Sequence, residues 1–125
     1  MSYQIGIVIL HVGDIARSRA FYTQSLGLSE VPEQSGPTFA VLRTAGDTLL
    51  ALEQALAAPA GFDENERHIV EIGFEVPNVD PAWQDWHAKG VPMLTEPAKT
   101  PFGRIFEARD PDGYPLNVYE LSRPA

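Results

Sequence analysis

Side chains alternate along residues 5–12 (IGIVILHV) in the way that a β-strand requires. The odd-numbered and even-numbered positions would face opposite ways, and because both sets are mainly apolar, we expect both faces to be covered. Asp14 is expected to cap the helix that follows, since its carboxylate can accept hydrogen bonds from the free amides of the first turn. Gly27 suits the left-handed residue that ends this helix. Three further strands are predicted over residues 29–33, 39–44 and 48–53, which makes this half of the chain a βαβββ module.

The second half of the chain repeats this design. Residues 76–79 (VPNV) match residues 12–15 (VGDI) about half a chain length later. We expect Asp80 to cap the second helix, with Pro81 at its first helical position. Tandem modules imply a cleft between them, and a functional site is expected there. The predicted strands of the second module cover residues 69–76, about 91–94, 104–109 and 116–121. The chain is thus predicted to consist of module 1 over about 1–56, a linker over about 57–67 and module 2 over about 68–125.

Composition limits the classes of function. A chain of 125 residues with 44% hydrophobic content can bury one compact core, and no apolar run is long enough to span a bilayer. The first residues lack the pattern of a secretory signal, and the absence of cysteine excludes disulfides and thiolate chemistry, so a cytoplasmic protein is expected. The formal charge of −8 disfavours nucleic acid and anionic membrane surfaces as partners. The same charge favours a cationic ligand, although a solvated acidic surface is its more frequent meaning.

Two segments carry a resemblance to a known family. Residues 14–28 (DIARSRAFYTQSLGL) and 106–121 (FEARDPDGYPLNVYEL) resemble the glyoxalase, bleomycin-resistance and extradiol-dioxygenase proteins, also called the vicinal oxygen chelate superfamily. The combination is specific to that superfamily but does not indicate which activity is present. It implies an α+β fold of two tandem βαβββ modules whose mixed sheets form a cup, commonly in a homodimer.

The resemblance also implies where a metal would bind. Enzymes of the superfamily hold one divalent cation in the cup, and the matching positions here are Ile7, Ala51, Glu71 and Asn117, with Glu53 as the alternative to Ala51 if the strand register differs. Only Glu71 is a strong donor, and Asn117 is a weak neutral one. A hard divalent cation needs several oxygen ligands, and zinc needs three or four ligands. We therefore expect neither a metal nor another cofactor.

Glu71 is the best single candidate for a functional residue. A carboxylate that faces an enclosed cup needs a partner or a raised pKa, and it would act as a general base or as an anchor for a cationic or hydrogen-bonding ligand. The alternative is a structural salt bridge to Arg104 or Arg43. His11 is either a ligand contact or a structural histidine at a strand end. The remaining expected lining suits a flat or hydrophobic organic molecule, and with Asn117 it comprises Ile7, Ile9, Phe39, Leu49, Phe102, Phe106 and Tyr119.

Two functions of different class follow. The first is a metal-free binding protein that sequesters an apolar or cationic organic molecule, of the antibiotic- or toxin-resistance type. The alternative is a glyoxalase-like enzyme: a metal-dependent lyase, isomerase or dioxygenase, or a metal-free enzyme with Glu71 as its base and His11 as partner. The hydrocarbon side chains of Ile7 and Ala51 favour the binding protein. A physiological metabolite unrelated to resistance is a third possibility for the ligand.

Overall fold

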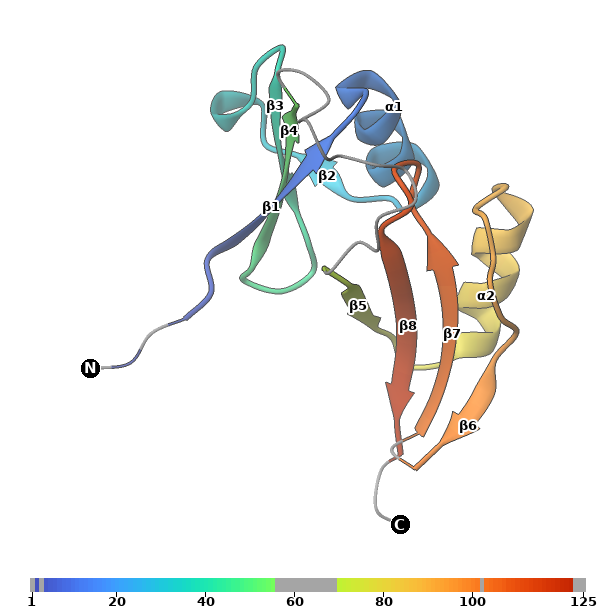
Figure 1. Cartoon of the computed structure of the whole chain (residues 1–125). Helices are drawn as coiled ribbons and strands as arrows, with labels where there is room; N and C mark the ends of the chain where they lie inside the picture. The colour runs from blue at the N-terminus through green and yellow to red at the C-terminus, as the bar shows by residue number, and fades with distance from the viewer. Residues whose placement is uncertain (1, 3, 56–69, 102, 123–125) are drawn as a thin grey trace. The chain divides into compact units, whose positions relative to one another are not determined.

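The computed structural model describes residues 2, 4–55, 70–101 and 103–122, and the chain divides into two compact units, Met1–Glu66 and Arg67–Ala125 (Figure 1). The predicted linker over residues 57–67 and the candidate Phe102 lie outside the described residues.

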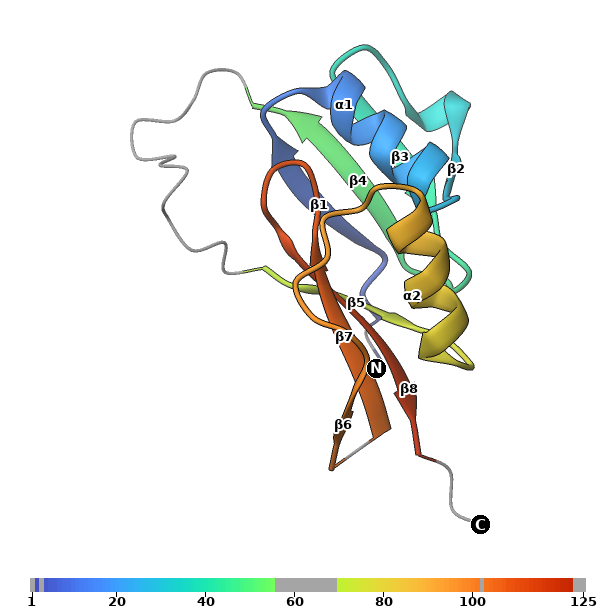
Figure 2. The ribbon, with the colours of Figure 1, turned by 90° about the vertical axis from the view of Figure 1, so that its right-hand side faces the viewer.

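The first unit is one four-stranded sheet with a helix on one face. Strand β1 runs parallel to β4, and β4, β3 and β2 are antiparallel neighbours, so the strand order is β1-β4-β3-β2. Helix α1 lies against β3 and β4 (Figure 2). This is the predicted βαβββ order. The elements are β1 (Ile7–Val12), α1 (Ile15–Ala20), a π-helical turn (Phe21–Ser25), β2 (Ser29–Glu30), a 3-10 turn (Pro32–Gln34), β3 (Phe39–Arg43) and β4 (Leu49–Gln54).

The ends of α1 are fixed by side chains and by a glycine. The Asp14 carboxylate accepts a hydrogen bond from the backbone N–H of Arg17 at 3.2 Å, which confirms the predicted cap. Gly27 has φ +77°, the left-handed conformation expected after the last turn. Gln54 adds a link that the pattern did not predict: its Oε1 accepts from the backbone N–H of Ile15 at 2.9 Å, and its Nε2 donates to the carbonyl of Gly13 at 2.8 Å. The end of β4 thereby holds the start of the helix.

The second unit has the same topology. Strand β5 runs parallel to β8, and the strand order is β5-β8-β7-β6. Helix α2 lies against β7 and β8 (Figure 1), and Gly90, with φ +79°, ends it as Gly27 ends α1. The elements are β5 (Ile72–Glu75), α2 (Val79–Ala88), β6 (Ala98–Thr100), β7 (Gly103–Arg109) and β8 (Pro115–Leu121).

Helix α2 begins two residues before the predicted start. Asn78, not Asp80, is the cap, because its Oδ1 accepts from the backbone N–H of Asp80 at 3.1 Å. Pro81 is consequently the third helical residue. Asparagine caps helices as well as aspartate does, and the Asp80 carboxylate is instead bound by Arg104.

The strand predicted near residues 91–94 is reduced to a single bridge between Met93 and Ala108. Pro92 has no N–H group and cannot donate to a ladder. The second strand of the unit lies farther along the chain, at β6, where Ala98 pairs with Ile105. The segment before it is held to β7 by isolated hydrogen bonds, such as the one at 2.8 Å from the N–H of Leu94 to the carbonyl of Glu107.

Candidate functional site

Each sheet has one face turned away from its helix, and these two helix-free faces hold most of the predicted site residues. In the first unit, Val8, Leu10 and Val12 point toward the α1 side, and the intervening residues of β1 point the other way. The strand register extends this set across β4 and β3. We call the resulting surface the first helix-free face: Ile7, Ile9, His11, Phe39, Val41, Arg43, Leu49, Ala51 and Glu53.

The middle of the first helix-free face is apolar. Val31, Val41 and Ala51 form a buried cluster, against which Phe39 and Leu49 pack. On β1, by contrast, Ile7 and Ile9 are 41% and 43% exposed, so this face of the strand is not covered as the alternation predicted. Large apolar side chains that are exposed next to each other on a sheet indicate a surface that binds a ligand or another protein.

One end of the first helix-free face is polar. His11 stands opposite Glu53 in the register, and Glu53 stands opposite Phe39, so the three residues form one row across the sheet. The distance from Nδ1 of His11 to Oε2 of Glu53 is 3.9 Å, and the two side chains are 64% and 47% exposed. From the sequence, Glu53 was predicted only as an alternative metal ligand. Its pairing with His11 could not be predicted, because it depends on the register of β1 against β4.

The second helix-free face lies on the sheet of β5, β8 and β7. Its central contact joins two predicted site residues, because Nδ2 of Asn117 donates to Oε1 of Glu71 at 3.0 Å. Tyr119 lies on the same side of β8. By the strand register this face consists of Glu71, Gly73, Glu75, Ile105, Glu107, Arg109, Asn117 and Tyr119.

Gly73 makes room for the contact between Asn117 and Glu71. It is the register partner of Asn117, and a Cβ atom at Gly73 would lie 2.9 Å from Oδ1 of Asn117 and 3.3 Å from Cε1 of Tyr119. Any side chain at this position would displace that amide. A glycine between two glutamates in a predicted strand was the available signal for such a close approach.

Phe106 does not belong to a binding surface, contrary to the prediction. It is the register partner of Val118, and both side chains are fully buried on the α2 side of the sheet. The Phe106 ring packs edge-to-face against Trp86 of α2 with centroids 5.6 Å apart. Strand parity explains the difference: β7 places Ile105 and Glu107 on the helix-free face and Phe106 in the core.

Arg104 is on the α2 side of its sheet and binds the helix. Its guanidinium donates to both oxygens of Asp80, at 2.6 and 3.1 Å, and its Nη1 lies 3.7 Å from Oε1 of Glu120. This hydrogen bond holds the pKa of Asp80 below its ordinary value and raises the pKa of Arg104. The partner that the structure gives to Glu71 is Asn117, and Arg104, one of the two arginines considered in the structural alternative, binds Asp80 instead.

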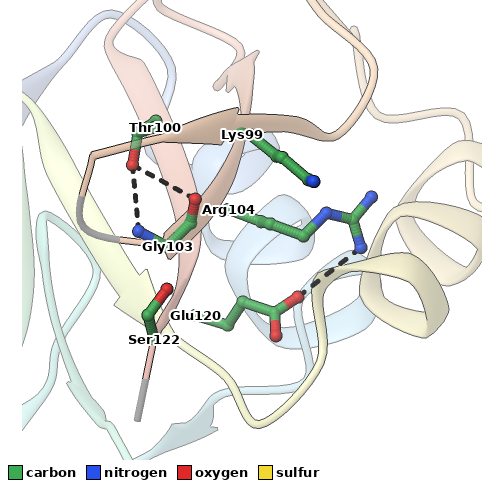
Figure 3. A pocket seen from close by; sticks show the side chains of 6 residues that line it. All are labelled: Lys99, Thr100, Gly103, Arg104, Glu120 and Ser122. Carbon is green, nitrogen blue, oxygen red and sulfur yellow. Dashed lines mark hydrogen bonds and ion pairs between the residues drawn. The ribbon is translucent and has the colours of Figure 1, made fainter. Parts of the chain in front are cut away.

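A cavity of about 340 Å³ adjoins Arg104 (Figure 3). The side chains of Arg104 and Glu120 meet at its wall, and Thr100 Oγ1 accepts from the backbone N–H of Gly103 at 3.2 Å. The guanidinium is paired with Asp80 and Glu120, and Oε1 of Glu120 also accepts from the backbone N–H of Val79 at 3.2 Å, so the cluster ties β7 and β8 to the start of α2. The lining residues are Lys99, Thr100, Gly103, Arg104, Glu120 and Ser122.

The positions that the resemblance matches to the superfamily's metal ligands offer few donor atoms. Ile7 and Ala51 face the expected way but carry no donor atom, and the register places Ala51 opposite Ile9. Glu71 and Asn117 are hydrogen-bonded to each other. Among the described residues, no group of three or more His, Cys, Asp or Glu side chains has the arrangement of a metal site.

Comparisons with known proteins agree with this architecture. A model of the family described as "Glyoxalase/Bleomycin resistance protein/Dioxygenase superfamily" matches residues 4–118. No curated protein matches the chain. Within the described residues, no helix is long and apolar enough to cross a membrane.

Solved structures share the fold over the whole chain. A glyoxalase/bleomycin resistance protein/dioxygenase from Nocardioides superposes with a TM-score of 0.82 at 24% identity, over 100% of this chain and 87% of the other. TnmS3, an antibiotic binding protein from Streptomyces sp. CB03234, superposes with a TM-score of 0.78 at 21% identity, over 97% and 98% of the two chains. The protein ATC0852 from Agrobacterium tumefaciens is 34% identical, with a TM-score of 0.75 over 98% of this chain and 100% of the other.

Proposed function

The chain belongs to the glyoxalase/bleomycin resistance protein/dioxygenase superfamily, and within it we propose a metal-free binding protein for an apolar or cationic small organic molecule. The observation that carries the proposal is the chemistry of the first helix-free face. Hydrocarbon side chains stand at Ile7 and Ala51, where the enzymes of the superfamily hold a cation. A surface of this kind binds hydrophobic molecules. Hydrocarbon side chains cannot hold a metal ion that would polarise a substrate.

The exposure of Ile7 and Ile9 supports a ligand surface in this place. Burying apolar surface against a ligand lowers the free energy by about 25 cal/mol per Å². Phe39 and Leu49 pack on the buried cluster beside them. The flat ring of Phe39 and the branched side chain of Leu49 would give a ligand further apolar contacts. Ring systems and aliphatic bodies match such a surface better than sugar phosphates, which need many hydrogen-bonding groups.

Glu71 is the proposed polar anchor on the second helix-free face. Asn117 holds its Oε1 at 3.0 Å, so the carboxylate has a defined orientation, and the side chain remains exposed. An oriented carboxylate binds an ammonium or amide N–H group at little entropic cost. Tyr119, beside Asn117 on β8, adds an aromatic contact.

Antibiotics are included among the candidate ligands because TnmS3, which shares the fold, is an antibiotic binding protein. We further propose that the protein is a homodimer that acts in the cytoplasm. Size-exclusion chromatography with light scattering tests the dimer, and a mass of one chain at micromolar concentration would refute it.

The decisive experiment combines metal analysis with ligand titration. Protein purified without chelator is analysed for bound metals, then titrated calorimetrically with hydrophobic amines and aromatic antibiotics, with and without EDTA. We expect saturable binding that EDTA does not change, with the ligand recovered unaltered by mass spectrometry. Ile9→Lys should weaken binding at least about tenfold, whereas Glu33→Gln, on the 3-10 turn, should not. One tightly bound metal per chain, or conversion of the ligand, would refute the proposal in favour of an enzyme.

A further inference from the structure

A single carboxylate stands at one end of the apolar part of the first helix-free face. Glu53 follows Leu49 and Ala51 on the same side of β4. Its side chain is 47% exposed, whereas Ala51 beside it is fully buried. The face therefore has an apolar body and an acidic end.

The contact between Glu53 and His11 leaves the carboxylate available to a ligand. At 3.9 Å the pair is longer than a hydrogen bond, and exposed ion pairs of this kind are weak because solvent screens them. A ligand cation that approaches Glu53 closely can compete with the imidazole for it.

Phe39 favours a cation at the same end. It is the register partner of Glu53 on the neighbouring strand, so an aromatic ring and a carboxylate lie next to each other. The face of an aromatic ring attracts cations through its quadrupole, and the chain's charge of −8 attracts cations over a longer range. Arg43, the one cation of this face, lies four residues farther along β3, at the opposite end.

The strand geometry sets the size of the molecule. Alternate residues of a strand are about 6.6–6.8 Å apart. The rows that begin at Ile7, Ile9 and His11 therefore span about 13 Å. A ring system with its charged group at one end matches this length.

We infer that the first helix-free face selects hydrophobic organic monocations, with Glu53 contacting the cationic group and Phe39 flanking it. Ile9 and the rows beside it contact the apolar body. This inference rests on the proposed binding function and adds to it the charge of the ligand and the residue that selects it.

Three probes that share a naphthalene ring test the inference: 1-naphthylmethylamine as the cation, 1-naphthalenemethanol as the neutral molecule and 1-naphthaleneacetate as the anion. Each is titrated into the full chain at pH 7.5 and low salt. We expect the cation to bind about three- to tenfold more tightly than the neutral probe, and the anion to bind most weakly. Glu53→Gln should make the cation and the neutral probe equal. Glu33→Gln, which removes the same charge elsewhere in the unit, should keep the preference.

A second variant keeps the test valid if Glu53→Gln fails to fold. His11→Lys places a permanent cation beside Glu53, and because the two charges cancel, the cation and the neutral probe should bind about equally. Equal binding of all three probes to the unaltered protein would overturn the inference and leave the proposed function standing. A cation preference that survives Glu53→Gln but disappears in Glu71→Gln would overturn it in favour of Glu71. No binding of any probe would overturn both the inference and the proposed function for ring-sized ligands.

Discussion

Nδ2 of Asn117 lies 3.0 Å from Oε1 of Glu71, so a side-chain hydrogen bond joins β8 to the residue that precedes β5. Both positions match metal ligands in the superfamily's enzymes, and here they bind each other. The amide occupies the space that Gly73 leaves open on the adjacent strand. The second helix-free face thus has a carboxylate with a fixed orientation, and this arrangement is open to test.

Gly73→Ala should disturb the site without unfolding the protein. The new Cβ would lie 2.9 Å from Oδ1 of Asn117, an atom at the end of a side chain that can rotate away. The lost hydrogen bond costs about 0.5–1.5 kcal/mol, and the stiffer unfolded chain returns about 0.4–1 kcal/mol. We expect urea unfolding to change by less than about 1 kcal/mol, while the affinity for amine ligands falls. Unchanged affinity would show that the orientation of Asn117 does not matter.

Gly103→Ala is the contrasting substitution. Gly103 has φ +157°, and a Cβ there would lie 1.9 Å from the backbone carbonyl oxygen of Glu120, which cannot rotate away. We expect a loss of at least about 3 kcal/mol in unfolding free energy, measured by urea denaturation. A loss as small as that of Gly73→Ala would contradict the close approach of Gly103 to the backbone of β8.

Glu71→Gln distinguishes a ligand-binding role of the Glu71 carboxylate from a structural role. If Glu71 anchors a hydrogen-bonding group of the ligand, the amide should weaken binding of the cationic and the neutral naphthalene probe by a similar factor, about threefold. Stability should stay within about 0.5 kcal/mol, because the side chain is exposed. Calorimetric titration and thermal unfolding of the same sample give both values. Unchanged affinity with a clear loss of stability would assign Glu71 a structural role.

The ion pair of Asp80 and Arg104 should make stability depend on pH. Its hydrogen bond keeps the pKa of Asp80 lower in the folded protein than the ordinary 3.8. Such a group adds stability that is fully present above its unfolded-state pKa and is lost as pH falls through the folded value. Arg104→Gln should therefore be less stable than the unaltered protein at pH 7, and the difference should narrow between pH 4 and pH 2.5. Urea denaturation across this range measures it, and Lys89→Gln, in the exposed pair with Asp85, is the control. A constant difference would contradict this account.

Phe106→Ala should act on the core. The ring is fully buried and packs on Trp86, so its removal should cost about 3–5 kcal/mol of unfolding free energy. Phe106→Leu keeps most of the volume and should cost less than about 1.5 kcal/mol. Its affinity for probes should equal that of the unaltered protein. A selective loss of ligand affinity in Phe106→Leu, with stability retained, would show that Phe106 contacts the ligand after all.

The short-range features of the fold were predictable because they depend on neighbours in the chain. The cap at Asp14 needs only the free amides of the next turn, and Gly27 and Gly90 take the left-handed conformation that ends each helix. The alternation of β1 correctly separated the α1 side from the helix-free face. The start of α2 was wrong because Asn78 and Asp80 are equally good caps by residue type, and Arg104, distant in sequence, binds Asp80.

By itself, then, the sequence determined two βαβββ modules through local periodicity, their family through the motifs of residues 14–28 and 106–121, and the absence of donor atoms at Ile7 and Ala51 through residue type. Only the tertiary structure decided which residues stand opposite each other. The register placed Glu53 opposite His11 and Asn117 opposite Gly73, from where the Asn117 amide reaches Glu71, and the parity of β7 placed Phe106 in the core. Register depends on the packing of whole strands, and a slip of one residue reverses every side chain.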